Sequence, residues 1–585
     1  MGPVGSGTYL RGWKVDNRAV ADVLEEMVML MDLKGENAFR TRAYANAARR
    51  IETMEETVQD LAEKGELDSV KGIGKGLAAG ISELLESGKM ASLEKLRQSV
   101  PEGLVEMMDV PGLGSKKVRA LYEEMQISDI DALAKACEAG EVEKLSGFGK
   151  KTAEKVLQGI AFLQEHRGRF LADTALNEAE KIRSFLAEQE GVIRVGVTGS
   201  IRRRCETTKD VDVVASTDDP AALGEVFAEY EEVWEVTGQG ETKVSVILKS
   251  GMGADLRMVV DEVFPFTLHH FTGSKEHNTQ MRARAKARGL KMSEYGLAGD
   301  SGDVVCKDEE EIFGALGLSF VPPELREGLG EIERAETGAF EPLVTENDLK
   351  GTLHVHTSHS DGRASVEGMA RAALALGHTY IGICDHSRAA AYAGGLTEER
   401  VRAQWDEIDQ VQGELEGIRI LKGIEVDIMS EGDLDFEDPF LAEFELVVAS
   451  VHSRFGMSQA EATERIVKAV LNPNVHILGH PTGRLLLSRD GYPLDLRAVL
   501  DAAADTGTSV EVNANPRRLD IDWRHLAYAK AQGVMISINT DAHSTGGLEQ
   551  MNYGVGIARK GGLTASDVLN ALPVDDFMTR ISRKS

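Results

Sequence analysis

Short apolar runs alternate with stretches of helical periodicity through the last third of the chain, and almost every run ends in a metal-binding type of side chain. Seven such runs follow residue 350, which is typical of a parallel barrel sheet wrapped by helices. The carboxyl ends of barrel strands converge on one rim, so we expect these side chains to meet there. One run, which ends near Asn513 and Asn515, has no obvious ligand. The candidate ligands are His354, His356, Asp361, His386, Glu425, His452, His480, Asp541 and His543.

Chance does not readily explain nine potential ligands at successive strand ends, although a single histidine there is more often structural. In His354-x-His356 and Asp541-x-His543, the side-chain period of two places both members on one face, so each pair can hold one ion. The set resembles the ligand pattern of the PHP (polymerase and histidinol phosphatase) domain. That resemblance implies about three ions of Mn²⁺, Zn²⁺ or Fe and a bridging hydroxide that attacks phosphorus. Arg484 is a candidate phosphate ligand, with an ordinary surface arginine as the alternative.

Three carboxylates in the middle of the chain form a second candidate metal site, among short β-branched runs that predict a small sheet. Asp210 and Asp212 share one face of a predicted strand, and Asp255 ends another. Carboxylates this close repel one another unless a cation lies between them. We expect about two Mg²⁺ or Mn²⁺ ions, which would activate a primer 3′ hydroxyl and stabilise the leaving pyrophosphate. The Gly199-Ser200 turn and Arg203 would hold the triphosphate, and the whole pattern resembles the nucleotidyltransferase palm.

The segment that follows indicates which family of nucleotidyltransferases the chain resembles. The run from His270 to Ser274, with Asn278 and Arg282, resembles the thumb of DNA polymerase beta and its family X relatives. The resemblance implies that Phe271 and Gly273 lie against the incoming sugar, Asn278 meets the minor-groove edge of the new base, and Arg282 lies near the template. Arg282 and Lys286 also stand four residues apart on a predicted helix, which gives a basic stripe for the DNA backbone.

Three departures from that family's pattern stand out. Glycine would be expected where Arg204 and Lys209 stand, so we expect two long cations to crowd the nucleotide pocket. His270 replaces the usual tyrosine, which bears on sugar discrimination. The Schiff-base lysine of the polymerase beta lyase aligns with Gly80, so we predict no lyase of that type through this position. Borohydride trapping of an adduct on the helix around Gly80 would contradict this expectation.

A glycine-rich pattern recurs three times in the first third of the chain, each time before an alanine-rich helix. Two glycines flanking one apolar residue allow a tight turn and expose backbone amides at a helix N-terminus, where a phosphate oxygen can bind. One such turn is as often a plain helix connection, but three with nearby lysines favour phosphate binding. They resemble helix-hairpin-helix motifs, which hold DNA backbones without reading sequence. The pairs are Gly72 and Gly74, Gly112 and Gly114, and Gly147 and Gly149.

The overall composition argues against several other classes of protein. The formal net charge of −30 argues against a simple nucleic-acid coat protein, so DNA contacts must be local. The four cysteines are scattered without a CxxC pair, which argues against a zinc finger and fits a reducing compartment. We find no apolar run long enough to cross a bilayer and no secretion signal, so we expect a cytoplasmic protein without a membrane partner.

A chain of 585 residues exceeds the limit for one hydrophobic core, so several domains are expected. We predict a multi-domain α/β protein with helix-hairpin-helix N-terminal domains, an α+β palm and thumb, and a distorted (β/α)7 barrel. The predicted boundaries are 1–95 for the first helical domain, 96–168 for helical fingers, 169–263 for the palm, 264–325 for the thumb, 326–349 for a linker and 350–585 for the PHP domain.

The order of modules, from about Val15 onward, resembles bacterial family X DNA polymerases with a PHP tail. The resemblance implies a protein that binds gapped or nicked double-stranded DNA and dNTPs and fills short gaps in base excision repair or end joining, and we expect it to be a monomer. It also implies a Mn²⁺-dependent 3′–5′ exonuclease, with cleavage at abasic sites in some members. Two alternatives stay open. One is a repair nuclease with a polymerase pocket weakened by Arg204 and Lys209, and the other is a DNA-end-binding scaffold with a small-molecule phosphatase tail.

Overall fold

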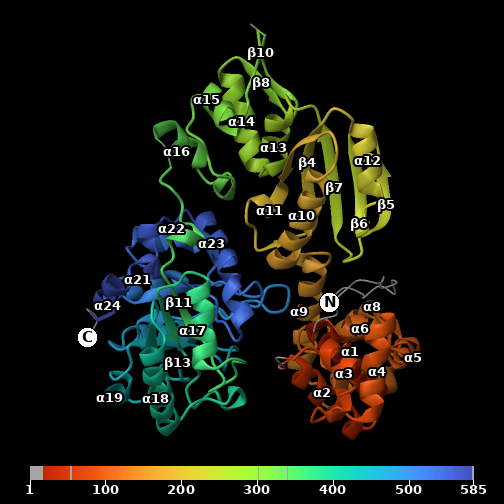
Figure 1. Ribbon diagram of the computed structural model, residues 1–585, viewed down its shortest axis with the longest axis vertical. Helices are drawn as coiled ribbons and strands as arrows, with labels where there is room; N and C mark the ends of the chain where they lie inside the picture. The colour runs from red at the N-terminus through yellow and green to blue at the C-terminus, as the bar shows by residue number, and fades with distance from the viewer. Residues whose placement is uncertain (1–16, 53, 55, 301, 339, 583–585) are drawn as a thin grey trace. The chain divides into compact units, whose positions relative to one another are not determined.

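The structure is a computed structural model that describes residues 17–52, 54, 56–300, 302–338 and 340–582. The chain divides into two compact units, Met1–Arg167 and Gly168–Ser585 (Figure 1). Among the described helices, none is long and apolar enough to cross a membrane. Each of the four cysteines is free.

The first unit is built of helices joined by short turns, as predicted. One buried cluster runs from Val20 to Ile160, so the two predicted helical domains share a single hydrophobic core. The central apolar residue of each glycine-rich turn is buried in it, because Ile73, Leu113 and Phe148 are at most 7% exposed. The helices are α1 (Asn17–Lys34), α2 (Ala38–Glu52), α3 (Val58–Lys64), α4 (Lys75–Ser87), α5 (Ala91–Ser99), α6 (Glu102–Met108), α7 (Ser115–Met125), α8 (Ile130–Glu138) and α9 (Lys150–His166).

The palm, which opens the second unit, is a five-stranded mixed sheet. Alternate residues of its central strands are buried, so one face packs on α10 and α12 while the other carries polar side chains. The strand order is β2 (Val192–Val197), β4 (Asp210–Thr217), β7 (Gly253–Val259), β6 (Lys243–Leu248) and β5 (Val233–Gln239). The helices are α10 (Ala172–Ala187), α11 (Gly199–Arg202) and α12 (Pro220–Ala228), and β1 (Phe170–Leu171) pairs with β3 (Thr207–Thr208).

The thumb packs helices against a small antiparallel meander around its own buried cluster. The helices are α13 (Phe264–Thr272), α14 (Lys275–Ala287) and α15 (Glu309–Ala315), and the strands are β8 (Leu290–Ser293), β9 (Gly296–Gly299) and β10 (Gly302–Val304).

The segment 326–349 is not the simple linker that the sequence suggested. It contains α16 (Glu331–Thr337), which buries Ile332 in the thumb core. Acidic side chains of this segment have fixed partners. The Glu331 carboxylate accepts hydrogen bonds from the Gly328 and Leu329 amides at 2.8 and 2.7 Å. The same carboxylate lies 2.8 Å from His277 Nδ1, so the acidic side chain fastens the segment to the thumb.

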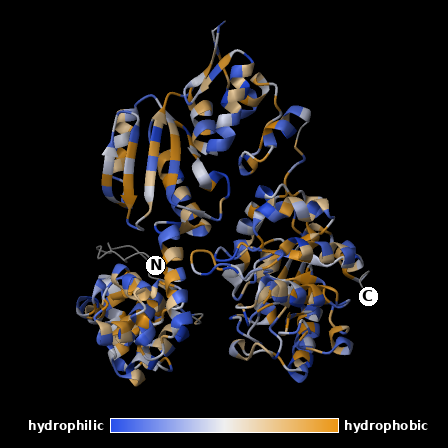
Figure 2. Cartoon of the chain, turned by 180° about the vertical axis from the view of Figure 1, so that it is seen from behind, coloured by the Kyte–Doolittle hydropathy of each residue, from blue (hydrophilic) through white to orange (hydrophobic). Residues whose placement is uncertain are grey.

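Seven parallel strands in chain order form the C-terminal sheet. A bridge between Val355 in the first strand and Ala542, just after the last strand, brings the two edges together, so the sheet nearly closes into the predicted barrel. The strands are buried on both faces, which explains their continuous apolar runs, and Figure 2 shows hydrophobic residues along them. The elements are β11 (Gly351–Val355), α17 (Val366–Ala375), β12 (Tyr380–Ile383), α18 (Glu398–Glu414), β13 (Arg419–Asp427), α19 (Asp438–Leu441), β14 (Leu446–Ser450), α20 (Gln459–Val470), β15 (Ile477–Leu478), α21 (Leu496–Thr506), β16 (Ser509–Asn513), α22 (Leu526–Ala531), β17 (Ile536–Asn539), α23 (Met551–Lys560) and α24 (Val574–Ser582).

Candidate active sites

The three palm carboxylates project from one face of the sheet. Asp210 and Asp212 lie two residues apart on β4, and the parallel register with β7 places Asp212 directly beside Asp255. Burial, followed by the charges of Asp210 and Asp255, raises the pKa of Asp212 to about 6. Burial and the charge of Asp255 also raise the pKa of Asp210. A divalent cation would relieve this repulsion, so the all-oxygen donor set fits Mg²⁺ or Mn²⁺.

Metal binding in the palm should weaken as the pH falls through about 6, the pKa of the Asp212 carboxyl. A proton and a cation compete for the same carboxylate, so the apparent Mg²⁺ affinity should fall roughly tenfold per pH unit below that value and level off above it. Rates of nucleotide addition at limiting Mg²⁺ across this range would measure the effect, and saturating Mg²⁺ should restore the rate at low pH. An apparent affinity that does not change with pH would contradict the prediction.

The turn after β2 approaches the carboxylates closely because residue 199 is glycine. Gly199 has a φ of +64°, and a Cβ there would lie 2.7 Å from Asp212 Oδ2. Thr198 fixes the turn by donating its amide to the Asp212 carbonyl oxygen at 2.8 Å. Ser200 Oγ lies 2.6 Å from Thr208 Oγ1. The predicted triphosphate turn therefore lies beside the carboxylates.

Arg203 follows that turn and is held by the thumb. Its Nη1 donates to the Thr272 carbonyl oxygen at 2.6 Å, and its Nε donates to Glu327 Oε1 at 3.0 Å. Gly273, with a φ of +68°, leaves room for this contact, because a Cβ there would lie 3.3 Å from Arg203 Nη1. The structure thus brings the predicted phosphate-binding arginine and the predicted sugar-facing turn together.

The other predicted nucleotide contacts lie on the same part of the thumb. Arg257 Cζ is 3.9 Å from the centre of the Phe271 ring, and His270 packs edge-on against that ring. Asn278 is buried, and its Nδ2 donates to the His270 carbonyl oxygen at 2.7 Å. Their contacts with a nucleotide stay predictions.

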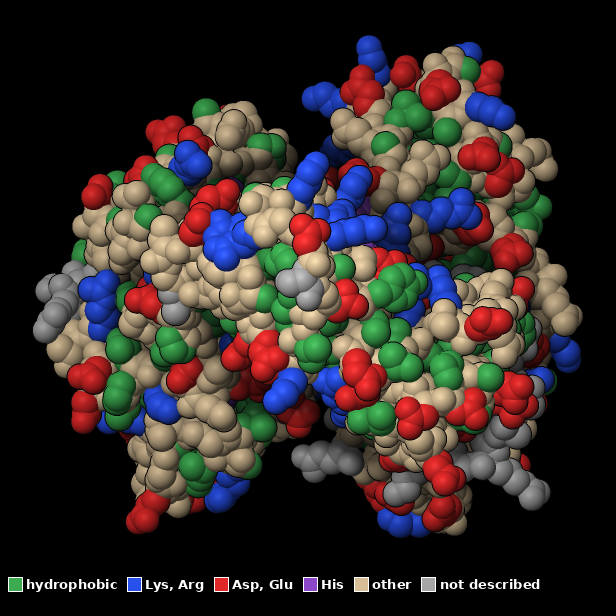
Figure 3. All heavy atoms as spheres, turned by 90° about the horizontal axis from the view of Figure 1, so that it is seen from above, with side chains coloured by type: hydrophobic (Ala, Val, Ile, Leu, Met, Phe, Trp, Pro, Cys, Tyr) green, Lys and Arg blue, Asp and Glu red, His purple; other side chains and the backbone are tan. Residues whose placement is uncertain are grey.

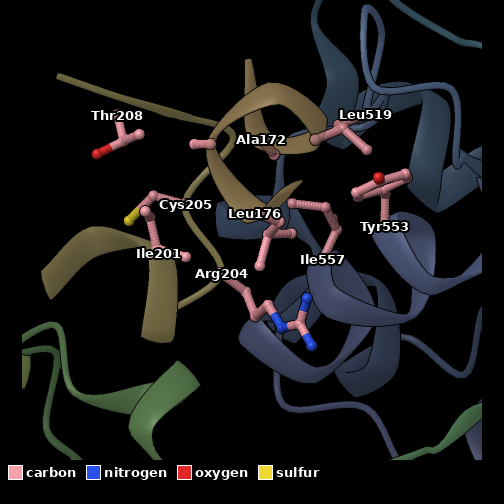
Figure 4. A pocket seen from close by; sticks show the side chains of 10 residues that line it. Ala172, Leu176, Ile201, Arg204, Cys205, Thr208, Leu519, Tyr553 and Ile557 are labelled. Atoms are coloured by element: carbon pink, nitrogen blue, oxygen red, sulfur yellow. The ribbon is translucent and has the colours of Figure 1, made fainter. Parts of the chain in front are cut away.

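Arg204 does not crowd the nucleotide pocket, contrary to the expectation from the sequence. It adopts a left-handed backbone conformation (φ +55°) like the glycine expected there, and its side chain lies against α23 of the barrel. A Cβ on Gly556 would lie 3.2 Å from Arg204 Cδ. Figure 4 shows Arg204 in a small pocket that Cys205 and Ile557 also line. Lys209 does lie near Asp210, since its charge partly offsets the rise in the pKa of that carboxyl, so its effect on nucleotides stays a prediction.

All nine predicted barrel ligands lie together at the carboxyl rim of the sheet. Glu425, near the end of β13, is central to them. Its oxygens lie 3.1 Å from His354 Nε2, 2.8 Å from His386 Nδ1, 3.2 Å from His452 Nε2 and 3.1 Å from His480 Nε2. Four overlapping groups have ligand atoms within 4.8 Å of one another: His356, Asp361, His386 and His543; His354, Glu425 and His480; His354, His356 and Asp541; and His386, Glu425 and His452.

The chemistry of this cluster fits bound cations. Burial, then the charges of His543 and His386, lowers the pKa of His356 to about 4, which leaves a neutral imidazole at neutral pH. Among the described residues, neither ring nitrogen of His356 makes a hydrogen bond, although Asp541 Oδ1 lies 3.1 Å from Nε2. Burial opposes protonation of His386, but Glu425 and Asp361 outweigh it and raise the pKa to about 11. In such a buried cluster, bound metal ions could neutralise the carboxylates and occupy the ring nitrogens in place of protons.

One side of the cluster is open. The side chains of Asp361 and His543 are 34% and 37% exposed, whereas the other ligands are at most 10% exposed. Tyr392, in the loop after β12, is 75% exposed, and its ring centre lies 6.3 Å from that of His386. Sequence reasoning missed Tyr392, because an isolated aromatic in an alanine- and glycine-rich loop carries little signal.

Glu511 is a further functional candidate that sequence reasoning missed. It lies inside β16, is fully buried, and its Oε1 is 2.7 Å from His354 Nδ1. Its Oε2 accepts a hydrogen bond from the His480 amide at 2.6 Å. Glu511 does not stand at a strand end, but a carboxylate within the apolar run Val510-Glu511-Val512 is a usable signal, because unpaired buried glutamates are rare.

Glu511→Gln should weaken metal binding by the barrel about 10- to 100-fold, because Glu511 orients the His354 ring and increases its basicity. Competition with a coloured chelator would measure the affinity. Glu443→Gln is the control, since Glu443 pairs on the surface with Arg402 at 2.9 Å. Equal affinities of the two variants would show that Glu511 does not support the ligands.

Arg484 is not an ordinary surface arginine, and its contact with a phosphate stays a prediction. Its side chain is 14% exposed. The guanidinium donates to the carbonyl oxygens of Arg518, at 2.9 Å, and Leu519, and lies 3.3 Å from Asp522 and 3.4 Å from Glu206. Through these contacts the guanidinium of Arg484 holds the loop after β16 in place.

The three glycine-rich turns present backbone amides to open space. Gly74, Gly114 and Gly149 cap α4, α7 and α9, and their partners Gly72, Gly112 and Gly147 have φ values of +100°, +88° and +86°. A Cβ on any of these six glycines would meet no described atom within 4 Å. Arg282 and Lys286 are exposed on α14. Figure 3 shows Lys and Arg side chains gathered near the middle of one face, with acidic side chains scattered around them.

The palm carboxylates define a nucleotidyltransferase core, and the nearly closed barrel with its ligand rim defines a metal-dependent phosphoesterase. Family models match four segments of the chain. They are a helix-hairpin-helix domain at residues 15–90, a SAM-like helix-hairpin-helix tandem at 104–161, the DNA polymerase beta thumb at 267–327 and a PHP domain at 352–514.

Relatives agree with this assignment. A DNA polymerase/3′-5′ exonuclease PolX of Bacillus subtilis is 41% identical over 96% of this chain and 98% of its own length. DNA polymerase lambda of Rattus norvegicus is 25% identical over 53% of this chain and 56% of its own length. A probable phosphatase of Thermoanaerobacter sp. is 30% identical over 37% of this chain and 88% of its own length. The chain belongs to the PolX family of DNA polymerases, so the predicted family and fold class are confirmed.

Proposed function

We propose that this protein fills short gaps in double-stranded DNA in base excision repair or end joining, and that its barrel trims 3′ ends in a Mn²⁺-dependent reaction and also cuts at abasic sites. The chain is a family X DNA polymerase joined to a 3′–5′ exonuclease. The proposal is supported by two distinct donor clusters, three carboxylates on the palm and nine mixed ligands on the barrel. We further propose that it works as a monomer on gapped or nicked duplexes.

In the palm, Asp210, Asp212 and Asp255 would hold about two Mg²⁺ ions, which supply activation of the primer 3′ hydroxyl and stabilisation of the leaving pyrophosphate. The 3′ oxygen then bonds to the α-phosphorus of the dNTP as the bond to pyrophosphate breaks. The Gly199-Ser200 turn donates to the triphosphate and Arg203 neutralises it. The thumb residues from His270 to Ser274, at the end of α13, orient the sugar.

In the barrel, the nine ligands would hold about three ions of Mn²⁺, Zn²⁺ or Fe, which supply a hydroxide nucleophile and polarise the phosphodiester. Glu511 and Asp427 orient His354 and His452, the latter through an Oδ1 to Nδ1 distance of 3.2 Å. At the open side, the exposed ring of Tyr392 is placed to stack on the terminal base.

Primer extension on a duplex with a one-nucleotide gap tests the proposal. We expect the parent protein to add one nucleotide when dNTPs and Mg²⁺ are present. A parent that shortens the primer but never extends it would favour a repair nuclease with an inactive polymerase pocket.

The likeness of the barrel to a probable phosphatase supports a second candidate, a DNA-end-binding scaffold that releases phosphate from small molecules. To separate the exonuclease from the scaffold, the parent and His356→Ala would be compared in two rates: 3′-end digestion and phosphate release from small phosphomonoesters. Loss of end digestion in the variant with unchanged gap binding would exclude the scaffold. The scaffold would be favoured if the parent digests no 3′ ends and His356→Ala loses the release of phosphate from small molecules.

Gly114→Val should weaken binding to gapped duplexes about tenfold, because a branched side chain would cover the first amides of α7. Gly114 has an extended backbone (φ −115°) and open space at its Cβ, so the fold should tolerate valine. Fluorescence anisotropy would measure the affinity, and Gly413→Val on α18, also with open space, is the control. Equal affinities would mean that these amides do not bind DNA.

A further inference from the structure

The last residue of α23 in the barrel, Lys560, reaches the junction of palm and thumb. Lys560 is only 3% exposed, which is rare for a lysine unless it is paired. Its Nζ donates to the Arg203 carbonyl oxygen at 3.0 Å and also contacts Glu327 Oε1. The Trp523 ring centre lies 4.6 Å from the same nitrogen. The ammonium group is therefore fixed by one barrel residue and two residues outside the barrel.

Glu327 links this lysine to the guanidinium of Arg203. The same oxygen, Oε1, accepts from Lys560 Nζ and from Arg203 Nε, the latter at 3.0 Å. Arg203 Nη1 is fixed in turn by the Thr272 carbonyl oxygen at 2.6 Å. The backbone and the side chain of Arg203 are thus both connected to Lys560.

Charge balance shows what the lysine contributes. Glu327 alone would neutralise Arg203 in a one-to-one ion pair, and an incoming triphosphate would have to compete with that carboxylate. Lys560 shares the same carboxylate oxygen, so the three groups carry one net positive charge beside the triphosphate turn. The neighbouring side chains of Arg204 and Cys205 line a pocket against the barrel (Figure 4), and the Arg203 carbonyl oxygen accepts from Lys560.

We propose that Lys560 is a positioning residue for nucleotidyl transfer: through Glu327, the nuclease barrel holds Arg203 of the palm in place and offsets the carboxylate charge that would otherwise oppose the dNTP triphosphate. This inference rests on the proposed polymerase function. It makes the barrel a structural part of the nucleotide site, with a role in polymerisation that is independent of its own metal cluster.

Steady-state gap filling by the full chain tests the proposal with three variants. Lys560→Met keeps the aliphatic stem but removes the charge, and it should raise KM for the dNTP about tenfold while changing kcat little. Lys560→Arg keeps the charge and should stay within about threefold of the parent. Arg559→Met is the matched control, because the neighbouring Arg559 bonds Glu324 at 2.7 Å across the same interface without contacting Arg203.

Exonuclease rate and Tm, measured on the same preparations, separate positioning from general damage. We expect Lys560→Met to digest 3′ ends at the parent rate. Equal KM values for the parent, Lys560→Met and Arg559→Met would overturn the inference, and so would equal increases in both Met variants. If the parent itself adds no nucleotide, the proposed polymerase function fails instead.

Discussion

Asp210→Ala should abolish primer extension while leaving 3′-end digestion at the parent rate. Asp210 and Asp212 share one face of β4 beside Asp255, and removing one carboxylate takes away part of a site that needs all three. The loss should be about 10³-fold or more in kcat, since charge stabilisation at the reacting phosphate carries most of this chemistry. Single-nucleotide incorporation into a gapped duplex would measure it.

The control for this prediction is Asp218→Ala, an exposed aspartate just beyond β4. That variant should extend primers like the parent. Extension by Asp210→Ala within a few-fold of the parent would show that the carboxylates do not hold the catalytic metals.

Glu425→Ala should abolish 3′-end digestion and leave gap filling intact. The Glu425 carboxylate is fully buried and lies within 3.2 Å of a ring nitrogen of four histidines. Without it, the four imidazoles lose the one carboxylate that they share. We expect bound transition metal to fall sharply and digestion to drop about 10³-fold or more.

Elemental analysis after dialysis would measure the metal, and a 3′-labelled primer would report digestion. Glu443→Gln, the surface variant, should match the parent in both assays. Retained digestion in Glu425→Ala would place the nuclease outside the barrel cluster.

The sequence predicted the barrel ligands because they stand at strand ends, where parallel topology dictates that they converge. It predicted the palm triad because the period of a strand places Asp210 and Asp212 on one face. The match of Asp212 with Asp255 needed the register of β4 and β7, which the structure supplies. Glu511 escaped notice because it lies within a strand, and its role depends on the neighbours that the barrel brings to it.

Residues whose roles depend on contacts between distant segments could not be read from the sequence. Arg204 matches a family position beside the nucleotide, but its side chain lies on the barrel, about 350 residues later in the chain. The partners of Arg484, which are carbonyl oxygens and two carboxylates, come from segments that only the folded chain brings to it. The predicted linker contains α16 because Glu331 finds local amides and His277 as partners.

The most direct measurement follows the length of one labelled primer on a gapped duplex, first with dNTPs and then after apyrase destroys them. One chain that carries both a joining and a cutting cluster should lengthen the primer and then shorten it. Asp210→Ala should only shorten the primer, and Glu425→Ala should only lengthen it. Loss of both activities in either single variant would contradict two independent metal sites.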